Sequence, residues 1–434
     1  MTAARAESVV ILGATLAGLT AAYELARRGY PLTLIEHPGW TDDLSATEHI
    51  LGCHTEIHAL LRSLPGVHSA APESSLPLEF LLTDGRIVSY RPTTLPGSLH
   101  WIAGLVRFRG LSWNDRWQLL SYLERIWEQE VSVPTTLDQR TADAWLASIG
   151  QSQPARDNIW SPLVRFLTGN PLADLSAASC ARILAPPFLT DARAARCTRL
   201  GPRVFTRLHD ALRAALTASG ARILTQPDVP HIQFSQHRIE HLRLCDGHMI
   251  NATWFLSGLP HHALLKLLPD RLLTRYAYFS QLSELTDLPG VSVQLTAPAP
   301  TAADRLVLLS GQAFQSIARS AADSSTALYE LSAVGNLPFT ERTDADLIDR
   351  AGQELQRLVP ALRSAHPLPA TVHRHPRAAL SLKAGTAILR PIQQSPVQNL
   401  LVAGSWTDTG WPGNSESAIV SARQCLKIIT GASA

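Results

Sequence analysis

The sequence predicts an α/β fold that starts with a parallel β-sheet. Residues 8–12 form a short β-branched run, residues 13–18 are small residues typical of a turn, and residues 19–28 repeat apolar side chains at helical spacing. A second apolar run at 31–35 ends at Glu36. This order of strand, turn, helix and strand is typical of a dinucleotide-binding unit, in which a helix N-terminus faces a pyrophosphate and an acidic side chain faces a ribose.

The turn of this unit departs from the usual glycine pattern. It reads Gly-Ala-Thr-Leu-Ala-Gly, so Thr15 stands where a glycine normally lets the backbone approach a phosphate. Crowding by its branched side chain would cost ~1–3 kcal/mol, and its hydroxyl could recover part of that cost by donating to a phosphate oxygen. An ordinary βαβ unit without a ligand is the alternative. The candidate cofactor-binding residues of this stretch are Gly13, Thr15, Leu16, Ala17, Gly18 and Glu36.

Three later segments carry further strands, and the first of them resembles the opening unit and is expected to add to the same sheet. A helix that ends at Gly220 is followed by the strand 221–225, a buried strand at 253–260 leads into a helix, and the strand 400–403 precedes a loop and a helix at 415–429. The other predicted elements are a hairpin at 76–94, two helices at 95–130, a capped helix at 141–149, more helix from 151 onward, a hairpin strand at 232–244 with a turn at 246–247, and a mixed stretch at 270–370 that periodicity does not resolve.

The size and composition indicate a well-buried globular protein of two lobes. The chain has 434 residues, of which 45% are hydrophobic and 17% charged, and a single core stops growing at about 250–300 residues. A net charge of +2 gives no reason to expect nucleic acid as a partner. The five cysteines are scattered and form no Cys-x-x-Cys pair, which indicates a reducing compartment.

No segment predicts export or membrane crossing. The first strand begins near residue 8, which leaves no room for a signal peptide, and no apolar run approaches the ~18 residues that span a bilayer. We expect a cytoplasmic protein, either soluble or held peripherally on the inner face of the membrane. The two helices at 95–130 carry Trp and Arg around an apolar surface, which suits an interface-lying segment or the mouth of a lipid tunnel. A core pair of helices is the equal alternative.

A cluster of potential metal ligands lies in residues 48–62, which show a mostly helical apolar stripe. It consists of His49, Cys53, His54 and His58. The arrangement His-x-Glu-x-His differs from the zinc-protease pattern, and no distant ligand cluster completes a site. We therefore expect a solvated helix face and no metal.

The C-terminal segment carries a family resemblance. A strand ending in Gly404, a Trp-Thr-Asp-Thr-Gly loop, and Pro412 before a helix that contains Glu416 resemble the C-terminal flavin motif of the amine oxidase and phytoene desaturase superfamily. Further stretches resemble hydroxysqualene dehydroxylases, which are squalene-associated FAD-dependent desaturases. These stretches are His49-Ile-Leu-Gly-Cys53 with Leu60-Leu61-Arg62, Asp84-Gly85-Arg86 to Leu95-Pro96, Trp145-Leu146 to Trp160-Ser-Pro162-Leu163, and Arg390-Pro391.

The resemblance implies a Rossmann-like FAD-binding domain built from the separated segments 1–68, 198–262 and 386–434. A mixed α+β substrate lobe at 69–197 and 263–385 would be inserted between them. The resemblance also implies FAD as cofactor, with Val229 near the adenine, Gly404 and Ser405 near the pyrophosphate and ribitol, and Trp411, Pro412 and Glu416 around the isoalloxazine.

Four positions depart from the family pattern. The Gly-Gly-Arg that family members carry after the acidic residue is missing between Glu36 and Glu48, and Ser405 stands where the family usually has Asp. The family's Asn-Gly-Gln-His reads Ala-Thr-Glu-His at residues 46–49. Together with Thr15, these changes mean that the flavin is either held differently or not held at all.

The implied activity is reductive removal of the hydroxyl group of hydroxysqualene, which yields squalene in squalene and hopanoid biosynthesis. An acid would assist the departure of water, and reduced flavin would deliver hydride to carbon. His49 is the first candidate for the acid and Asp408 the second, with a structural role as the alternative for His49. The rival functions are a carotenoid-type desaturase and a flavin-free isoprenoid-binding or assembly protein. The expected partners are an isoprenoid lipid, a membrane surface and enzymes of the squalene pathway.

Overall fold

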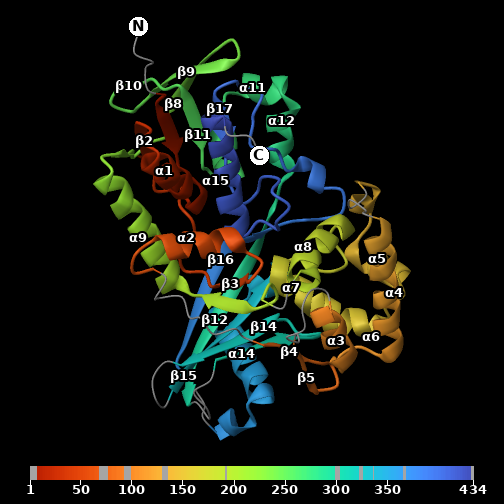
Figure 1. The fold of residues 1–434 in the computed structure, drawn as a ribbon. Coiled ribbons are helices and arrows are strands. Elements are labelled where there is room, and N and C mark those ends of the chain that lie inside the picture. Colours follow the sequence, from red (N-terminus) through yellow and green to blue (C-terminus); the bar gives the residue numbers. More distant parts are fainter. Residues whose placement is uncertain are drawn as a thin grey trace.

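A computed structural model describes residues 7–67, 77–91, 99–129, 135–190, 193–298, 304–321, 326–335, 337–364 and 368–431. The molecule contains two large sheets, and the helices between residues 99 and 189 lie beside the second one (Figure 1).

The first sheet is parallel throughout and has five strands in the order β17-β11-β1-β2-β7. Its central strands are buried along their whole length, as expected where helices cover a parallel sheet. The strands come from well-separated parts of the chain, which confirms the predicted α/β class, whereas the domain boundaries stay a prediction. The strands are β1 (Val9–Leu12), β2 (Leu32–Glu36), β7 (Arg222–Thr225), β11 (Trp254–Ser257) and β17 (Leu400–Val402).

Helix α1 (Leu16–Arg27) lies against this sheet and contacts α15 (Ser415–Thr430) and α9 (Pro202–Ala218). Three glycines permit the close approach of helix and sheet. A Cβ on Gly18 would lie 2.1 Å from the Gly13 carbonyl oxygen, and a Cβ on Gly258 would lie 2.7 Å from the Gly18 Cα. Gly13 also has a φ of +95°, which other residues rarely adopt.

The second sheet is mixed and has seven strands in the order β16-β12-β15-β14-β13-β4-β5. Helix α14 (Asp344–Leu358) packs on it through Leu347 and Leu355, which lie in a core with Val293 and Leu331. Its strands β12 to β15, together with α14, lie in the stretch 270–370, which periodicity did not resolve. The strands are β4 (Leu78–Leu81), β5 (Ile87–Tyr90), β12 (Asp287–Pro298), β13 (Arg305–Leu309), β14 (Ser316–Ala321), β15 (Thr326–Val334) and β16 (Ala370–Leu380).

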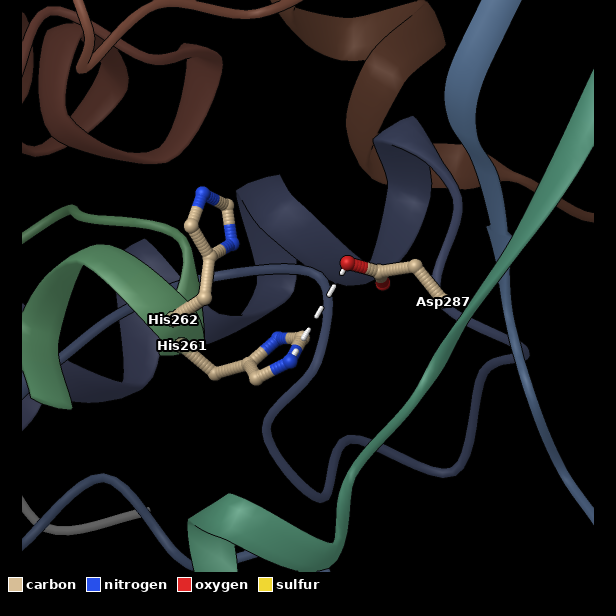
Figure 2. A group of neighbouring side chains, drawn as sticks. All are labelled: His261, His262 and Asp287. Carbon is tan, nitrogen blue, oxygen red and sulfur yellow. Dashed lines mark ion pairs between the residues drawn. The ribbon is translucent and has the colours of Figure 1, made fainter.

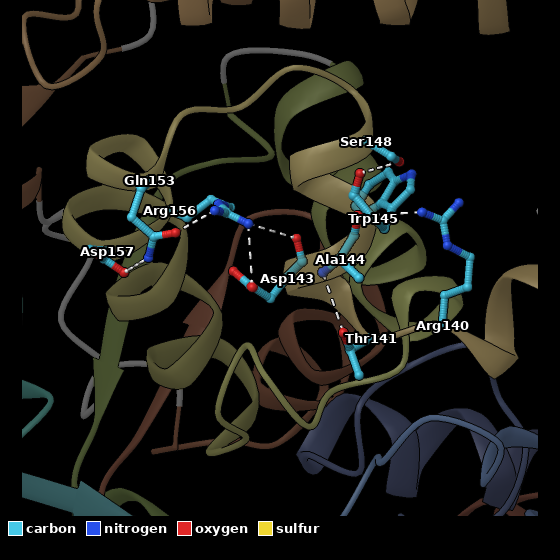
Figure 3. A network of polar contacts seen from close by, with 9 residues as sticks. All are labelled: Arg140, Thr141, Asp143, Ala144, Trp145, Ser148, Gln153, Arg156 and Asp157. Carbon is cyan, nitrogen blue, oxygen red and sulfur yellow. Dashed lines mark hydrogen bonds and ion pairs between the residues drawn. The ribbon is translucent and has the colours of Figure 1, made fainter.

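The helices between residues 99 and 189 confirm the helical structure that was predicted after the hairpin. They include α5, which begins after its N-cap Thr141, whose hydroxyl accepts from the Ala144 amide at 3.3 Å. Arg156 ties α5 to the next helix through Asp143 at 3.3 Å (Figure 3). The family-like residues Trp145 and Trp160 are buried here, so they serve packing. The helices are α3 (Leu99–Arg107), α4 (Trp113–Gln129), α5 (Ala142–Ser148), α6 (Gln153–Ala155), a π-helical turn (Arg156–Trp160), α7 (Ser161–Thr168) and α8 (Ala177–Leu189).

Two predictions of secondary structure were wrong in part. The helix expected at 48–62 starts as a strand, β3 (Glu48–Leu51), which pairs antiparallel with β6 (Cys197–Leu200), and only α2 (Thr55–Ser63) is helical. Pairing with a strand distant in the sequence overrides a local helical pattern. The stretch 232–244 is two strands, β8 (His231–Ser235) and β9 (Arg238–Arg243), separated by a turn in which Gln236 has a φ of +50°.

The remaining elements are short. They are β10 (Met249–Ile250), α10 (His261–Leu267), α11 (Asp270–Arg275), α12 (Ala277–Ser280), α13 (Leu337–Thr340) and 3-10 turns at Thr135–Gln139, Gln281–Glu284, Pro360–Ser364 and Ala387–Leu389. Among the described residues, no helix has both the length and the apolar character needed to cross a membrane.

Candidate flavin site

Two cavities lie where the end of β1, the C-terminal loop and the mixed sheet meet. The larger has a volume of about 320 Å³ and the smaller about 190 Å³, and ligand pockets are typically roughly 300–1,000 Å³. Both are lined by Asp42, Asp43 and Ser405, so they are neighbours along one site.

The predicted site residues, all within the described ranges, divide into three groups. Leu16, His49, Trp411 and Pro412 line the larger cavity, and Ser405 lines both. Thr15, Ala17 and Gly404 line the smaller cavity. Gly13, Gly18, Glu36, Val229, Asp408 and Glu416 line neither.

The side chain of Thr15 is turned into the protein. Its hydroxyl donates to the Gly258 carbonyl at 2.5 Å and accepts from the Gly18 amide at 3.3 Å, so it caps α1. These bonds employ the hydroxyl that was expected to donate to a phosphate. Gly258 was not among the predicted site residues, because its partner Thr15 lies 243 positions away in the sequence.

A carboxylate stands at the N-terminus of α1. The Leu16 amide donates to Asp42 Oδ2 at 2.5 Å, and His209 Nε2 lies 3.5 Å from the same oxygen. The next residue, Asp43, contacts His375 Nδ1 at 2.6 Å. Neither aspartate was among the predicted site residues, although both lie in the segment where the family has Gly-Gly-Arg.

Glu36, the expected ribose acceptor, has partners within the chain. It forms an ion pair with Arg213 from α9 and accepts from Thr225 Oγ1 at 3.4 Å. Its role toward a ribose stays a prediction. Val229 is 41% exposed and lies away from both cavities.

Arg390 holds the C-terminal loop in place. Its guanidinium donates to the carbonyl oxygens of Ser405 at 3.1 Å, Trp406 at 3.3 Å, Thr407 at 2.6 Å and Trp411 at 2.7 Å. Burial lowers the pKa of Arg390 to about 10, which leaves it charged near neutral pH. This contact gives a physical reason for the family-like Arg-Pro pair.

Two further carboxylates lie at helix N-termini. Glu48 accepts from the Ser415 amide at 3.1 Å and from the Ser415 hydroxyl at 2.5 Å, at the start of α15. Glu416 accepts from the Ile57 amide at 2.9 Å, at the start of α2. Burial raises the pKa of Glu48 above its ordinary value and that of Glu416 to about 7. Glu48 lines the larger cavity, whereas Glu416 does not.

The histidines of β3 and α2 are held in neutral form. Burial, and secondarily Arg199, lowers the pKa of His49 to about 3, and its ring lies 5.1 Å from that of Phe166. His54 Nδ1 accepts from the Leu51 amide at 3.2 Å, and His58 Nε2 lies 3.1 Å from the Leu51 carbonyl oxygen. These contacts are structural, and the lowered pKa does not favour His49 as an acid. Asp408, the second candidate, is exposed and lines neither cavity.

Three potential metal ligands lie together near the smaller cavity, and two of them, His261 and Asp287, line it. His261, His262 and Asp287 present ligand atoms within 4.8 Å of one another, and His261 Nε2 lies 4.0 Å from Asp287 Oδ2 (Figure 2). Arg377 lies near enough to lower the pKa values of both histidines, after the larger effect of burial. Its positive charge opposes a cation at this place.

The framework around the cavities fits the FAD that the sequence implies. The strand, turn and helix are in the expected order, Gly13 has the required conformation, and the loop 404–413 closes over the same site. The charges differ from this expectation, because the chain's own carboxylates already occupy the N-termini of α1 and α15. The residues that would hold the cofactor are Leu16, Ala17, Ser405, Trp411 and Pro412.

Comparisons with known proteins agree with this framework. The family model for flavin containing amine oxidoreductases matches residues 47–425. The chain is 23% identical over 453 residues to 15-cis-phytoene desaturase of Arabidopsis thaliana, covering 97% of this chain and 79% of that protein. It is 23% identical over 329 residues to zeta-carotene desaturase of Synechocystis sp., covering 68% of this chain and 66% of that protein.

A solved structure shows the same fold at still lower identity. The crystal structure of an oxidoreductase from Methanosarcina mazei superimposes with a TM-score of 0.67 at 14% identity, covering 97% of this chain and all of that one. The match of the family model over most of the chain, the parallel sheet and the glycine turn together show that this chain belongs to the flavin containing amine oxidoreductase family and is an FAD-dependent oxidoreductase.

Proposed function

We propose that the protein removes the hydroxyl group of an isoprenoid alcohol of the hydroxysqualene type by reduction. The observation that carries this proposal is the mixed lining of the larger cavity. Apolar side chains such as Ile183, Phe205 and Val291 lie there together with hydroxyl groups of Ser292 and Ser316. Such a lining suits a long apolar chain that bears one hydroxyl group better than it suits a pure hydrocarbon.

Glu48 is the acid of this proposal. It lines the larger cavity, and burial raises its pKa, which favours the protonated form that an acid catalyst needs. Its proton would join the departing hydroxyl group to form water as the carbon–oxygen bond breaks. When bound in its reduced form, the flavin supplies the hydride that completes the new carbon–hydrogen bond. Arg390 would keep the loop 404–411 in shape beside the reacting carbon.

The proposal also assigns the residues that would hold FAD and the lobe that would hold the substrate. The turn at 13–18, with Leu16 and Ala17, would lie along the FAD, and Ser405, Trp411 and Pro412 would border it. The three segments that supply the parallel sheet would form the FAD-binding domain, and the mixed sheet with helices α3 to α8 would form the substrate lobe.

A product analysis tests the proposal. Purified protein with FAD and a chemical reductant is incubated with hydroxysqualene, and squalene is measured by mass spectrometry. We expect squalene to form, and Glu48→Gln to lower the rate by about a hundredfold or more, the usual share of an acid catalyst. Glu240→Gln makes the same change at an exposed position outside both cavities and is the matched control, with an unchanged rate. His49→Gln should lower the rate less than Glu48→Gln. The reverse pattern would assign the acid to His49, and turnover of phytoene without turnover of hydroxysqualene would contradict the proposal in favour of a desaturase.

A flavin-free isoprenoid-binding protein is a second candidate function. The position of Asp42 favours it, because this side chain takes the Leu16 amide at the N-terminus of α1, where a pyrophosphate would bind. Purified protein that lacks flavin absorbance and shows no thermal shift with added FAD would support this candidate. A coloured protein, or a rise in melting temperature with FAD, would exclude it.

A further inference from the structure

We infer that Asp42 competes with the pyrophosphate of FAD for the N-terminus of α1, so that the loop 41–43 must move away before the cofactor binds. The inference rests on the proposed position of FAD along the turn at 13–18, and it adds a chain-encoded control of loading that the proposed function does not contain.

The first step of the argument concerns the donors of α1. A helix N-terminus offers amide donors and the positive end of the helix dipole, which together attract one anion. The Gly18 amide is used by Thr15 Oγ1, and the Leu16 amide is used by Asp42 Oδ2 at 2.5 Å. Since α1 has no acidic residue in its own first turn, the carboxyl group at this end comes from Asp42, whose pKa burial raises above its ordinary value.

The second step concerns what holds Asp42 there. His209 of α9 is only 7% exposed, and its Nε2 points toward Asp42 Oδ2 at 3.5 Å without a hydrogen bond to any described residue. The adjacent Asp43 contacts His375 Nδ1 at 2.6 Å, and His375 Nε2 lies 3.1 Å from Ser292 Oγ. The loop is therefore fastened to α1 and α9 on one side and to the mixed sheet on the other.

The third step compares two anions at one position. Asp42 and a pyrophosphate oxygen are both acceptors, and the single Leu16 amide hydrogen cannot serve both in good geometry. Asp43, the neighbour of Asp42, also lines both cavities, and its carboxylate would repel a phosphate group there. The apparent affinity for FAD is then the intrinsic affinity multiplied by the fraction of molecules in which the loop is open.

A binding experiment with two probes tests the inference. Apo-protein is titrated with FAD, followed by quenching of flavin fluorescence, and separately with riboflavin, which has no phosphate. We expect Asp42→Ala to tighten FAD binding about tenfold or more while riboflavin binding changes less than about twofold. Asp304→Ala removes the same charge at an exposed position outside both cavities and leaves both affinities unchanged.

Three outcomes would overturn the inference. They are unchanged or weaker FAD binding by Asp42→Ala, an equal gain for riboflavin, which would indicate general loosening, and an equal gain for Asp304→Ala. If the alanine variant unfolds, Asp42→Asn replaces it, because it removes the acidic group but keeps the shape of the side chain. Its affinities for FAD and riboflavin are then compared with those of the wild type. The proposed function fails separately, when Asp42→Ala loads FAD more tightly but the loaded protein forms no squalene.

Discussion

Arg390 is the residue on which the geometry of the C-terminal loop depends. Its guanidinium reaches four carbonyl oxygens of the loop at once, a geometry that the planar, five-donor group of arginine allows and lysine does not. We expect Arg390→Met to lower the free energy of unfolding by about 3 kcal/mol or more, because buried carbonyls lose a charged donor. Arg390→Lys should recover only part of this. Urea unfolding measures both effects. Equal stability of Arg390→Met and the wild type would contradict this role of Arg390.

Burial of His54 leads us to expect that the free energy of unfolding falls in acid. Burial, with a smaller effect of His58, lowers its pKa from an ordinary 6.5 to about 3, and its Nδ1 accepts from the Leu51 amide. Between pH 6.5 and about 3 the unfolded chain therefore binds a proton that the folded chain does not, so stability falls by up to about 1.4 kcal/mol per pH unit as pH decreases. Above pH 6.5 this contribution is constant.

The measurement is urea unfolding at about pH 7.5 and about pH 5.5. His54→Asn keeps an acceptor for the Leu51 amide but does not titrate, so the loss on acidification should be smaller by about 1 kcal/mol. His248→Asn, at an exposed turn position, should leave the loss unchanged. An identical loss in the wild type and in His54→Asn would refute this source of acid sensitivity.

At the scale of single residues, local pattern and tertiary contact contribute differently to the candidate site, and the roles of the predicted residues toward a cofactor stay predictions. Thr15, Ser405 and Trp411 do line the cavities, because their places follow from a strand–turn–helix pattern that is local. The partners Asp42, Gly258, His209 and Arg390 could not be assigned in advance. Each reaches the site from a part of the chain whose approach depends on tertiary structure, which no local pattern records.

Among the elements, α4 presents the most exposed aromatic surface. Trp113 and Trp117 are 66% and 62% exposed and stand one helical turn apart, with Arg107 and Arg109 exposed on the adjoining segment. We propose that this surface contacts a membrane that contains anionic lipid, because exposed Trp and Arg favour the interfacial region. Sedimentation with vesicles of phosphatidylglycerol should retain the protein.

Trp113→Ala with Trp117→Ala should weaken vesicle binding by about tenfold or more, as expected for the loss of two interfacial aromatic anchors. The control pair Met249→Ala and Ile388→Ala removes two exposed apolar side chains elsewhere on the surface and should bind like the wild type. Equal sedimentation of all three proteins, or no binding of the wild type, would exclude α4 as a membrane contact.

The element-level predictions succeeded where hydrophobic pattern and pairing agree. The hairpin β4–β5, the capped helix α5 and the closing pair of β17 and α15 were all expected from sequence. The start of the segment 48–62 was not, because Ile50 and Leu51 fit a helical stripe equally well. Their pairing with Cys197 and Thr198 decides the structure, and that pairing spans almost 150 residues.

The whole molecule depends on both ends of the chain. Strand β17 pairs with β11 in the interior of the fold, and α15 packs against α1, so the first and last helices share one core. We expect a chain that ends at residue 385 to lack cooperative unfolding, because β11 and α1 lose their buried contacts. Circular dichroism during thermal unfolding measures this.

Addition of residues 386–434 as a separate chain should restore a cooperative transition, since the missing strand and helix need no covalent link to pack. A truncated chain that unfolds as cooperatively as the full chain would contradict the shared core. Long connections between parallel strands also predict slow folding, because distant segments must meet before the sheet gains stability.

The carboxylates at the N-termini of α1 and α15 give cofactor loading an unusual character. In an ordinary empty phosphate site, the amide donors at the helix N-terminus have no partner in the protein until the phosphates bind. Here each helix end already holds a carboxyl group of the protein itself, Asp42 at α1 and Glu48 at α15. Loading is therefore an exchange of one hydrogen-bond acceptor for another, because the donors at these helix ends have partners within the chain before any cofactor arrives.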